Sequence, residues 1–385
     1  MRDLFGERTL ALLGLNNLLV YSKLYGAFAI LYFSEVTGTY TGGMIVYAAI
    51  RLSVVVFEVP TGVMSDLIGR VRTLQIGTLA MFVAILCYAL AGSMVLLLAG
   101  AVLEGAARAL FSGNNSALLF ETLKARGQVG RFHHYFGYLE TLSHIGMGIG
   151  ALVGGVLADM SLRIVVVASL LPAFAALLLV LPLRESAQRI RSEGSSLRLH
   201  MDAWRAVLSD RRLRLFTLAQ AVATGFDEAV WNFRSAYLAS VWPVWAVGLL
   251  NALDHIGAMA GSYLSGPVID RFRHSAVLQW YQWIDFVSYA VAVGLRTAWS
   301  PLIMVAPSFL YSVCETAREQ LVQDHFSDQQ RATMGSILSV AKNIGYAFAS
   351  LLIGIVADHV SVGAALLVGS TVPLFVLPLY RAYFR

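Results

Sequence analysis

The chain has 385 residues, of which 58% are hydrophobic and only 13% are charged, and its mean hydropathy is +0.69. Soluble domains carry about 25% charged residues, so this composition excludes a soluble globular protein and predicts an integral membrane protein. The net charge of +5 does not indicate a nucleic-acid partner, because the basic residues lie between apolar runs. Cys87 and Cys314 lie in separate runs and predict neither a disulfide nor a metal site.

Apolar runs of about 20 residues, the length that crosses a bilayer as a helix, recur along the chain. Breakers and charged clusters separate twelve expected spans, at residues 10–34, 42–65, 73–92, 94–123, 131–158, 163–183, 211–239, 243–269, 275–296, 300–325, 331–357 and 361–383. With the N-terminus inside, 20 of the 28 Lys and Arg residues fall in inner segments, and only Arg163 and Arg296 fall in outer ones. The positive-inside rule therefore predicts a multi-pass protein of the cytoplasmic (inner) membrane with both termini cytoplasmic.

The chain is expected to divide into two halves, residues 1–184 and 210–385, joined by a cytoplasmic linker at 185–209 that is rich in Ser and Arg. The halves are weakly similar. At an offset of 199 residues, Gly146, Gly155 and Asp159 match Gly345, Gly354 and Asp358. At an offset of 204, Gly62 and Asp66 match Gly266 and Asp270. These matches fall on spans five and eleven and after spans two and eight, which predicts a duplicated six-helix unit.

The loop between the second and third spans carries a G-x-x-x-D-x-x-G-R pattern, formed by Gly62, Asp66, Gly69 and Arg70. The glycines permit a tight turn and close helix approach, Asp66 can pair at a helix end, and Arg70 marks the cytoplasmic side. The pattern resembles the signature loop of major facilitator superfamily (MFS) transporters. We expect it to act in gating, together with Glu58 at the inner end of the second span.

The resemblance implies the MFS fold, an all-α integral membrane protein with 12 transmembrane helices in two six-helix bundles. It further implies a secondary active transporter that moves a small-molecule substrate by alternating access, with the site between the halves near the bilayer midplane. We expect a monomer in the lipid bilayer that uses a proton as coupling ion and needs no cofactor.

The fifth span carries a glycine pattern, formed by Gly146, Gly150, Gly154 and Gly155. It resembles the antiporter motif G-x-x-x-G-P-x-x-G-G-x-L of bacterial proton-coupled drug and metabolite exporters, with Ala151 in place of the proline. Small residues let helices approach closely, and we expect these glycines to join spans five and eight at the outer gate.

The glycine pattern favours proton-coupled export of a small organic molecule. An importer of a sugar, organic acid or vitamin is the alternative if the glycines only pack. A lipid flippase is a further alternative, and it would need a lateral opening. A non-transporting sensor would be expected to carry an added soluble domain. The sequence has no P-loop and no H-E-x-x-H, so neither an enzyme nor ATP-driven transport by this chain is expected.

Ionisable residues at membrane depth are costly and usually face a cavity or a partner. We expect a cavity for substrate and protons that involves Tyr21, Tyr25, Glu104, Arg108, Asn115, Asp227, Glu228, Trp231, Asp254, His255, Glu315 and Arg318. Glu104 and Arg108 lie four residues apart on one helix face and are expected to pair. The candidate proton carriers are Glu104, Asp227, Glu228 and Asp254. The alternative for each is a structural ion pair that locks helices together.

Overall fold

The computed structural model describes residues 8–183, 207, 209–272, 274–325 and 328–378. Every regular element within these ranges is a helix, in agreement with the expected all-α class. The predicted linker at 185–209 lies outside the described residues except for positions 207 and 209, and so do both ends of the chain.

The first half of the chain forms one bundle of helices. Its elements are α2 (Arg8–Tyr21), η1 (Gly26–Phe28), α3 (Ala29–Thr37), α4 (Tyr40–Ile68), α5 (Arg70–Ala89), α6 (Met94–Phe111), α7 (Asn114–Ala125), η2 (Val129–Arg131), α8 (Phe132–Ala158), α9 (Leu162–Ala168) and α10 (Leu170–Val180).

The second half forms another bundle. Its elements are α12 (Arg211–Val241), α13 (Val244–Arg271), α14 (His274–Leu295), α15 (Ser300–Val305), α16 (Ser308–His325), α17 (Asp328–His359), α18 (Val362–Thr371) and η3 (Val372–Val376).

Helices occupy parts of all twelve predicted ranges, but several ranges are not continuous helices. The first span is interrupted between α2 and η1, the fourth at Gly113, the sixth at Ser169, and the tenth at Pro307. Gly113 adopts a positive φ of 68°, which favours glycine. Pro307 has no backbone N–H and cannot donate the hydrogen bond that would continue the helix.

Six segments within the described ranges are long and apolar enough to cross a membrane. They are Tyr40–Ile68, Arg70–Ala89, Met94–Ala125, Val129–Ala158, Leu162–Val180 and Met334–His359. Charged residues reduce the hydropathy of other helices, among them α12 with its Asp227 and Glu228. Twelve crossings and the cytoplasmic placement of both termini therefore stay predictions.

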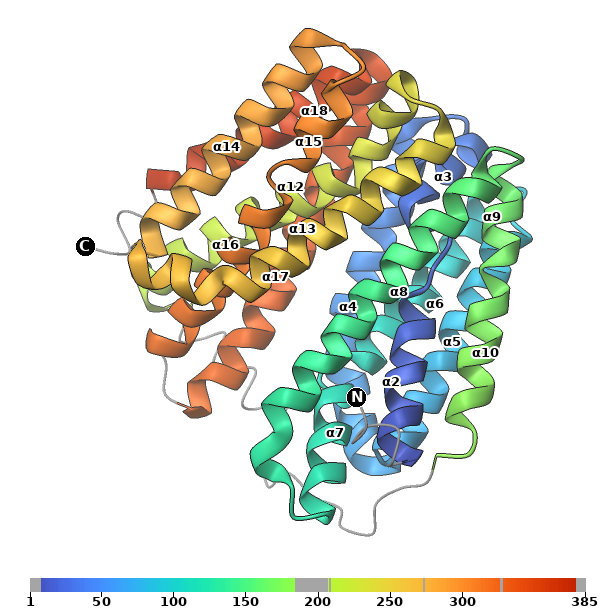
Figure 1. Cartoon of the computed structure of the whole chain (residues 1–385), viewed down its shortest axis with the longest axis vertical. Helices are drawn as coiled ribbons and strands as arrows, with labels where there is room; N and C mark the ends of the chain where they lie inside the picture. The colour runs from blue at the N-terminus through green and yellow to red at the C-terminus, as the bar shows by residue number, and fades with distance from the viewer. Residues whose placement is uncertain (1–7, 184–206, 208, 273, 326–327, 379–385) are drawn as a thin grey trace.

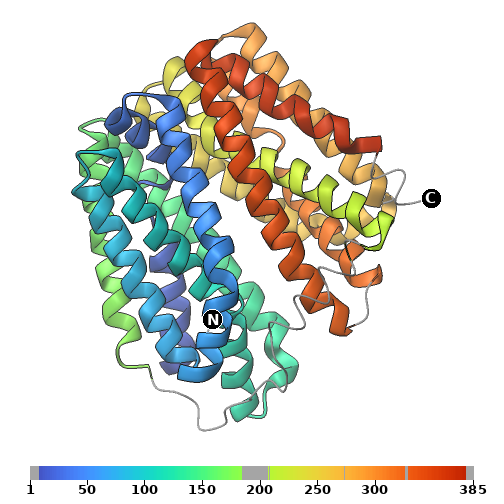
Figure 2. The same cartoon turned by 180° about the vertical axis from the view of Figure 1, so that it is seen from behind.

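The two bundles meet at one end and separate toward the other, as Figures 1 and 2 show from opposite sides. At the joined end α4 packs beside α17, and α8 packs beside α13. The bundles diverge toward the end where α7 lies. We call these the closed end and the open end. The basic residues around Arg70 and Arg72 follow α4 at the open end, which the positive-inside rule predicts to be cytoplasmic.

The two contacts between bundles at the closed end are related by the internal repeat. A Cβ on Gly155 of α8 would lie 2.6 Å from the Trp245 carbonyl oxygen of α13. A Cβ on Gly354 of α17 would lie 2.8 Å from the Thr41 Cα of α4. Gly354 follows Gly155 by 199 residues and Trp245 follows Thr41 by 204, the offsets found in the sequence. Matched positions therefore make matched contacts across the interface.

Candidate functional site

A cavity of about 1010 Å³ lies between the two bundles, large enough for a small organic molecule. Eleven of the twelve residues expected there line it: Tyr21, Tyr25, Glu104, Arg108, Asn115, Asp227, Glu228, Trp231, Asp254, His255 and Glu315. The twelfth, Arg318, is buried behind the wall and bonds to wall residues. The structure thus brings these residues together, while their roles in binding and coupling stay predictions.

On the wall formed by the first bundle, Glu104 is the centre of a buried polar cluster. One carboxylate oxygen, Oε1, accepts from Lys23 Nζ and Arg108 Nη2, both at 2.7 Å. The other, Oε2, accepts from the hydroxyl groups of Tyr25 at 3.1 Å and Tyr88 at 3.0 Å. The expected pairing of Glu104 with Arg108 is present. Four donors satisfy the carboxylate, and a buried charge requires such compensation.

Lys23 and Tyr25 reach Glu104 because the first span is not helical around them. A continuous helix satisfies its own backbone hydrogen bonds, whereas an unwound segment at membrane depth must be supported by protein. Here Tyr25 N donates to Ser169 Oγ at 3.2 Å, and that serine lies at the junction of α9 and α10. The break therefore turns a lysine and a tyrosine toward the cavity.

The glycines of α8 accommodate this break. Gly146, Gly150 and Gly154 each face a backbone carbonyl of the first span, at Leu18, Lys23 and Leu24 respectively. A Cβ on Gly150 would lie 3.2 Å from the Lys23 oxygen, and the contacts at the other two are closer still. The expectation that these three glycines join the eighth span was wrong, because they pack within their own bundle. Of the four motif glycines, Gly155 is the one whose nearest neighbours are on α13.

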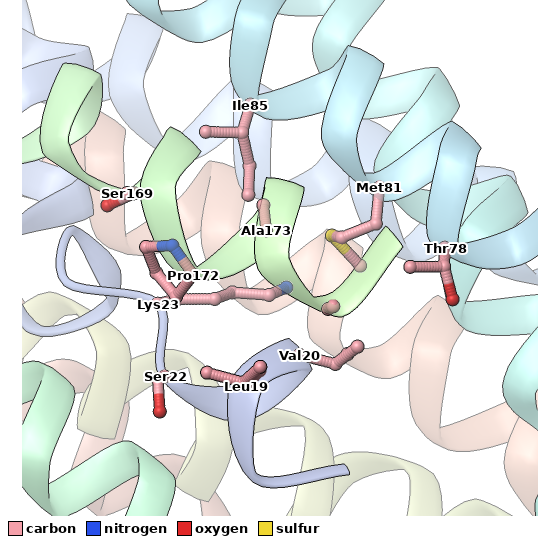
Figure 3. A pocket seen from close by; sticks show the side chains of 11 residues that line it. Leu19, Val20, Ser22, Lys23, Thr78, Met81, Ile85, Ser169, Pro172 and Ala173 are labelled. Carbon is pink, nitrogen blue, oxygen red and sulfur yellow. The ribbon is translucent and has the colours of Figure 1, made fainter. Parts of the chain in front are cut away.

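A second pocket, of about 10 Å³, lies behind the break (Figure 3). Figure 3 shows Ser22 and Lys23 on the non-helical segment, with Ser169, Pro172 and Ala173 on the facing helices. This volume admits about one water molecule. The pocket is therefore a packing feature of the break and is too small for a substrate.

On the wall formed by the second bundle, Asp254 is held by two partners. Arg234 binds it in bidentate fashion, with Nη1–Oδ1 at 3.1 Å and Nη2–Oδ2 at 2.8 Å. Trp231 Nε1 donates to Oδ2 at 2.6 Å. Both charged side chains are buried. Paired, parallel hydrogen bonds of this kind fix the orientation of both groups, so α12 and α13 are locked together beside the cavity.

Asp227 belongs to a chain of charges that links α12 to α16 and α17. Its Oδ2 accepts from Gln282 Nε2 at 2.9 Å and from Arg318 Nη2 at 3.4 Å. Arg318 also pairs with Glu315, whose other oxygen lies 3.7 Å from Lys342 Nζ. The guanidinium group thus holds two carboxylates on neighbouring helices.

An ion pair crosses between the bundles within the cavity. Arg51 of α4 pairs with Glu228 of α12, and its Nη1 lies 3.4 Å from the Asn343 oxygen of α17. The same guanidinium group lies 4.4 Å from the ring centroid of Tyr346. Every one of these contacts joins residues of different bundles, so they must change if the bundles move apart.

The loop that we expected to act in gating, at residues 62–70, is bound to its own bundle at the open end. Gly69 joins α4 to α5 with a φ of 103°, a conformation that glycine adopts without strain. Asp66 Oδ1 lies 2.9 Å from Arg70 Nη2, and Arg70 Nε lies 3.5 Å from Glu121 Oε1 of α7. The expected turn and pairing are present. A Cβ on Gly62 would meet no atom within 4 Å, so the expected close approach at this glycine was wrong.

Glu58 lies on the other side of this region, where Ser339 Oγ of α17 donates to its Oε2 at 3.4 Å. This weak contact joins the two bundles nearer the open end than Arg51 does.

The closed end carries a contact that the sequence interpretation missed. Both oxygens of Asp358 accept from the N-terminus of α4, with Tyr40 N–Oδ1 and Thr41 N–Oδ2 each at 2.8 Å. The α4 dipole favours a negative charge there. Asp358 was identified only through its match to Asp159, so the repeat was the available signal.

Sequence reasoning also missed several charged residues of the cavity. Lys23 and Arg51 line it but were not chosen as candidates. Each is an ionisable residue within an apolar run, which is the signal that identified the others. Asp285, on α14, also lines the cavity; it is recognisable as a charge within the ninth predicted span but was not placed among the expected cavity residues.

Residues 10–237 match the family model described as the Major Facilitator Superfamily. A relative with 23% identity over 252 residues is the uncharacterized MFS-type transporter YfmI of Bacillus subtilis (strain 168), and the match spans 60% of each chain. The structure is similar to that of the nucleoside transporter NupG, with a TM-score of 0.80, 15% identity, and 97% and 98% of the two chains covered. It is also similar to a D-xylose-proton symporter, with a TM-score of 0.73, 12% identity and 97% of each chain covered. At these identities the structural matches establish the fold alone.

Proposed function

Because the chain belongs to the major facilitator superfamily and is a multi-pass integral membrane protein, we propose that it moves a small polar molecule across the cytoplasmic membrane by proton-coupled alternating access. The observation that carries this proposal is the cavity of about 1010 Å³ between the bundles. The bundles are joined at one end of the molecule and separate at the other. Such an arrangement supports an inward-open state of a carrier whose halves rock around a central site.

The lining of the cavity favours a polar substrate. Its walls carry the cluster around Glu104, the pair of Arg234 with Asp254, and the pair of Arg51 with Glu228. An acyl chain drawn into this space would displace water from ionised groups without replacing their hydrogen bonds, which is costly. The lining therefore argues against a lipid flippase and for a molecule with several hydrogen-bonding groups.

For the direction of transport we propose uptake by proton symport. The glycine motif was the reason to expect export, and Gly146, Gly150 and Gly154 are accounted for by support of the broken first span. The symporter named among the structural relatives adds to this preference. Export is the second candidate, because Gly155 does contact α13 at the closed end.

The test uses the full chain in proteoliposomes with radiolabelled uridine, D-xylose and a panel of amino acids and organic acids. An alkaline lumen should drive accumulation of at least one of these solutes, and a protonophore should abolish it. Accumulation driven only by an acidic lumen would replace symport with proton exchange, the exporter mechanism. Accumulation that follows a sodium gradient and ignores the pH gradient would refute proton coupling.

A further inference from the structure

We propose that Asp285 is the carboxylate that takes up the coupling proton. This inference rests on the proposed proton-coupled transport and names the residue that the coupling requires. Asp285 lies on α14, lines the cavity and is only 9% exposed. Within the described ranges, no hydrogen bond or ion pair is recorded for its carboxylate.

The four carriers expected from the sequence differ from Asp285 in this respect. Each has a cationic partner: Glu104 has Lys23 and Arg108, Asp227 has Arg318, Glu228 has Arg51, and Asp254 has Arg234. A proton added to any of them would remove the negative charge from an existing ion pair. The cost is greatest at Asp254, because its partner Arg234 is buried and would be left uncompensated. A proton added to Asp285 breaks no ion pair.

The charge count of the second bundle indicates the same residue. Three buried carboxylates of this wall, Asp227, Asp254 and Asp285, face two buried cations, Arg234 and Arg318. One negative charge is in excess, and an ionised carboxylate without a partner is costly to bury. Protonation of Asp285 from cavity water cancels this excess.

Groups on four helices, α14 itself among them, face Asp285. Its electrostatic neighbours are Asp227 and Arg234 on α12 and Asp254 on α13. Tyr281 and Tyr289 lie one turn before and after it on α14, and Cys314 approaches from α16. The charge of Asp285 therefore acts on both ion pairs of this wall.

Through these neighbours, protonation of Asp285 can influence the interface between the bundles electrostatically. Asp227 is adjacent in sequence to Glu228, which pairs with Arg51 of the first bundle. A change of charge at Asp285 alters the field at Asp227 and its partner Arg318. It therefore acts on the middle of α12, where Glu228 also lies. Loading of the proton is thereby connected to the contact that must break when the bundles move.

The experiment detects the proton directly, without a substrate. Purified full-length protein in lipid is studied by pH-difference infrared spectroscopy, which reports the C=O stretch of a protonated carboxyl group. The native protein should show such a band that appears as the pH is lowered. Asp285→Asn should lose it, and Glu319→Gln, which removes an exposed cavity carboxylate on α16, should keep it. Asp285→Glu should keep a band at a shifted frequency.

A band that is unchanged in both Asp285 variants would overturn the assignment, and so would its absence from the native protein. If Asp285→Asn fails to fold, the frequency in Asp285→Glu decides, and an unshifted band counts against Asp285. The result is independent of the uptake assay. Loss of solute accumulation in the native protein with an intact Asp285 band would refute the transport proposal and leave the proton site in place.

Discussion

Replacement of Asp358 by alanine should open the closed end. In the native structure this carboxylate holds the N-terminus of α4 in the other bundle through two backbone hydrogen bonds of 2.8 Å. Alanine keeps the helix intact but removes both acceptors. The contact exists only while the bundles are joined at this end, so its loss raises the free energy of that state alone.

The magnitude follows from the nature of the contact. Removal of a capping side chain costs about 0.5–2 kcal/mol, and a carboxylate at a helix N-terminus gains about 0.3–1 kcal/mol from the dipole when exposed. Asp358 is exposed, so we expect about 1 kcal/mol after solvent screening. That corresponds to a roughly fivefold change in the equilibrium between the two states of the carrier.

Pulsed electron paramagnetic resonance in nanodiscs measures this equilibrium. Spin labels on cysteines introduced at Met160 and Trp299, both about 70% exposed beyond α8 and α14, report the separation of the bundles. Cys87 and Cys314 are replaced in this background. The population with the longer distance should grow about fivefold relative to the background protein.

Asp159→Ala is the matched control. Asp159 occupies the equivalent place in the repeat, 199 residues earlier. Helix α13, which corresponds to α4, begins after Pro243 without a side-chain cap. The control should leave the distances unchanged. Equal distance distributions for Asp358→Ala and its background, or equal shifts in both variants, would refute the role of Asp358 as a contact specific to the joined state.

Three further substitutions test other parts of the structure. Gly155→Val should also separate the bundles, because overpacking at this contact costs about 1–3 kcal/mol. Gly148→Val is its control, since it adds a side chain where no atom lies within 4 Å. The same distance measurement compares the two variants. Glu104→Gln leaves Lys23 and Arg108, which are 16% and 39% exposed, without the charge of a buried carboxylate. It should cost up to about 3 kcal/mol after solvent screening of Arg108 and lower the thermal unfolding midpoint, and an unchanged midpoint would contradict the described cluster. Asp66→Asn removes a half-buried ion pair worth about 0–1 kcal/mol. Expression and the unfolding midpoint should therefore stay nearly native while the transport rate falls. A native transport rate would refute gating by this loop.

Many of the cavity residues could be identified from the sequence because they are charged residues within apolar segments. A charge within an apolar run is so costly in lipid that it indicates a protein-lined interior. This argument located Glu104, Asp227 and Asp254, and it required no knowledge of their partners. The repeat likewise predicted a duplicated six-helix unit, and the matched contacts of Gly155 and Gly354 are consistent with it.

The sequence could not identify the ion-pair partners of these residues, except for neighbours on one helix such as Glu104 and Arg108. Lys23 and Glu104 are 81 residues apart, and Arg51 and Glu228 are 177 apart. Helical periodicity relates residues three or four positions apart and contains no information on which faces of two distant helices meet. The expected partner of Gly146, Gly150 and Gly154 was wrong for the same reason, because the sequence did not reveal that the first span is broken.

The sequence by itself determined the membrane setting, the helical class, the family and most of the charged residues from which the cavity is built, because hydropathy and charge are properties of each segment. The tertiary structure decided how those charges are used. Two aspartates matched by the repeat make different contacts. Asp358 binds a helix N-terminus, whereas no such contact is recorded for Asp159 within the described residues. Among the buried carboxylates of the described residues, Asp285 has no recorded ion pair because of how α12, α13 and α14 pack, and the cost of an unpaired charge arises from that environment.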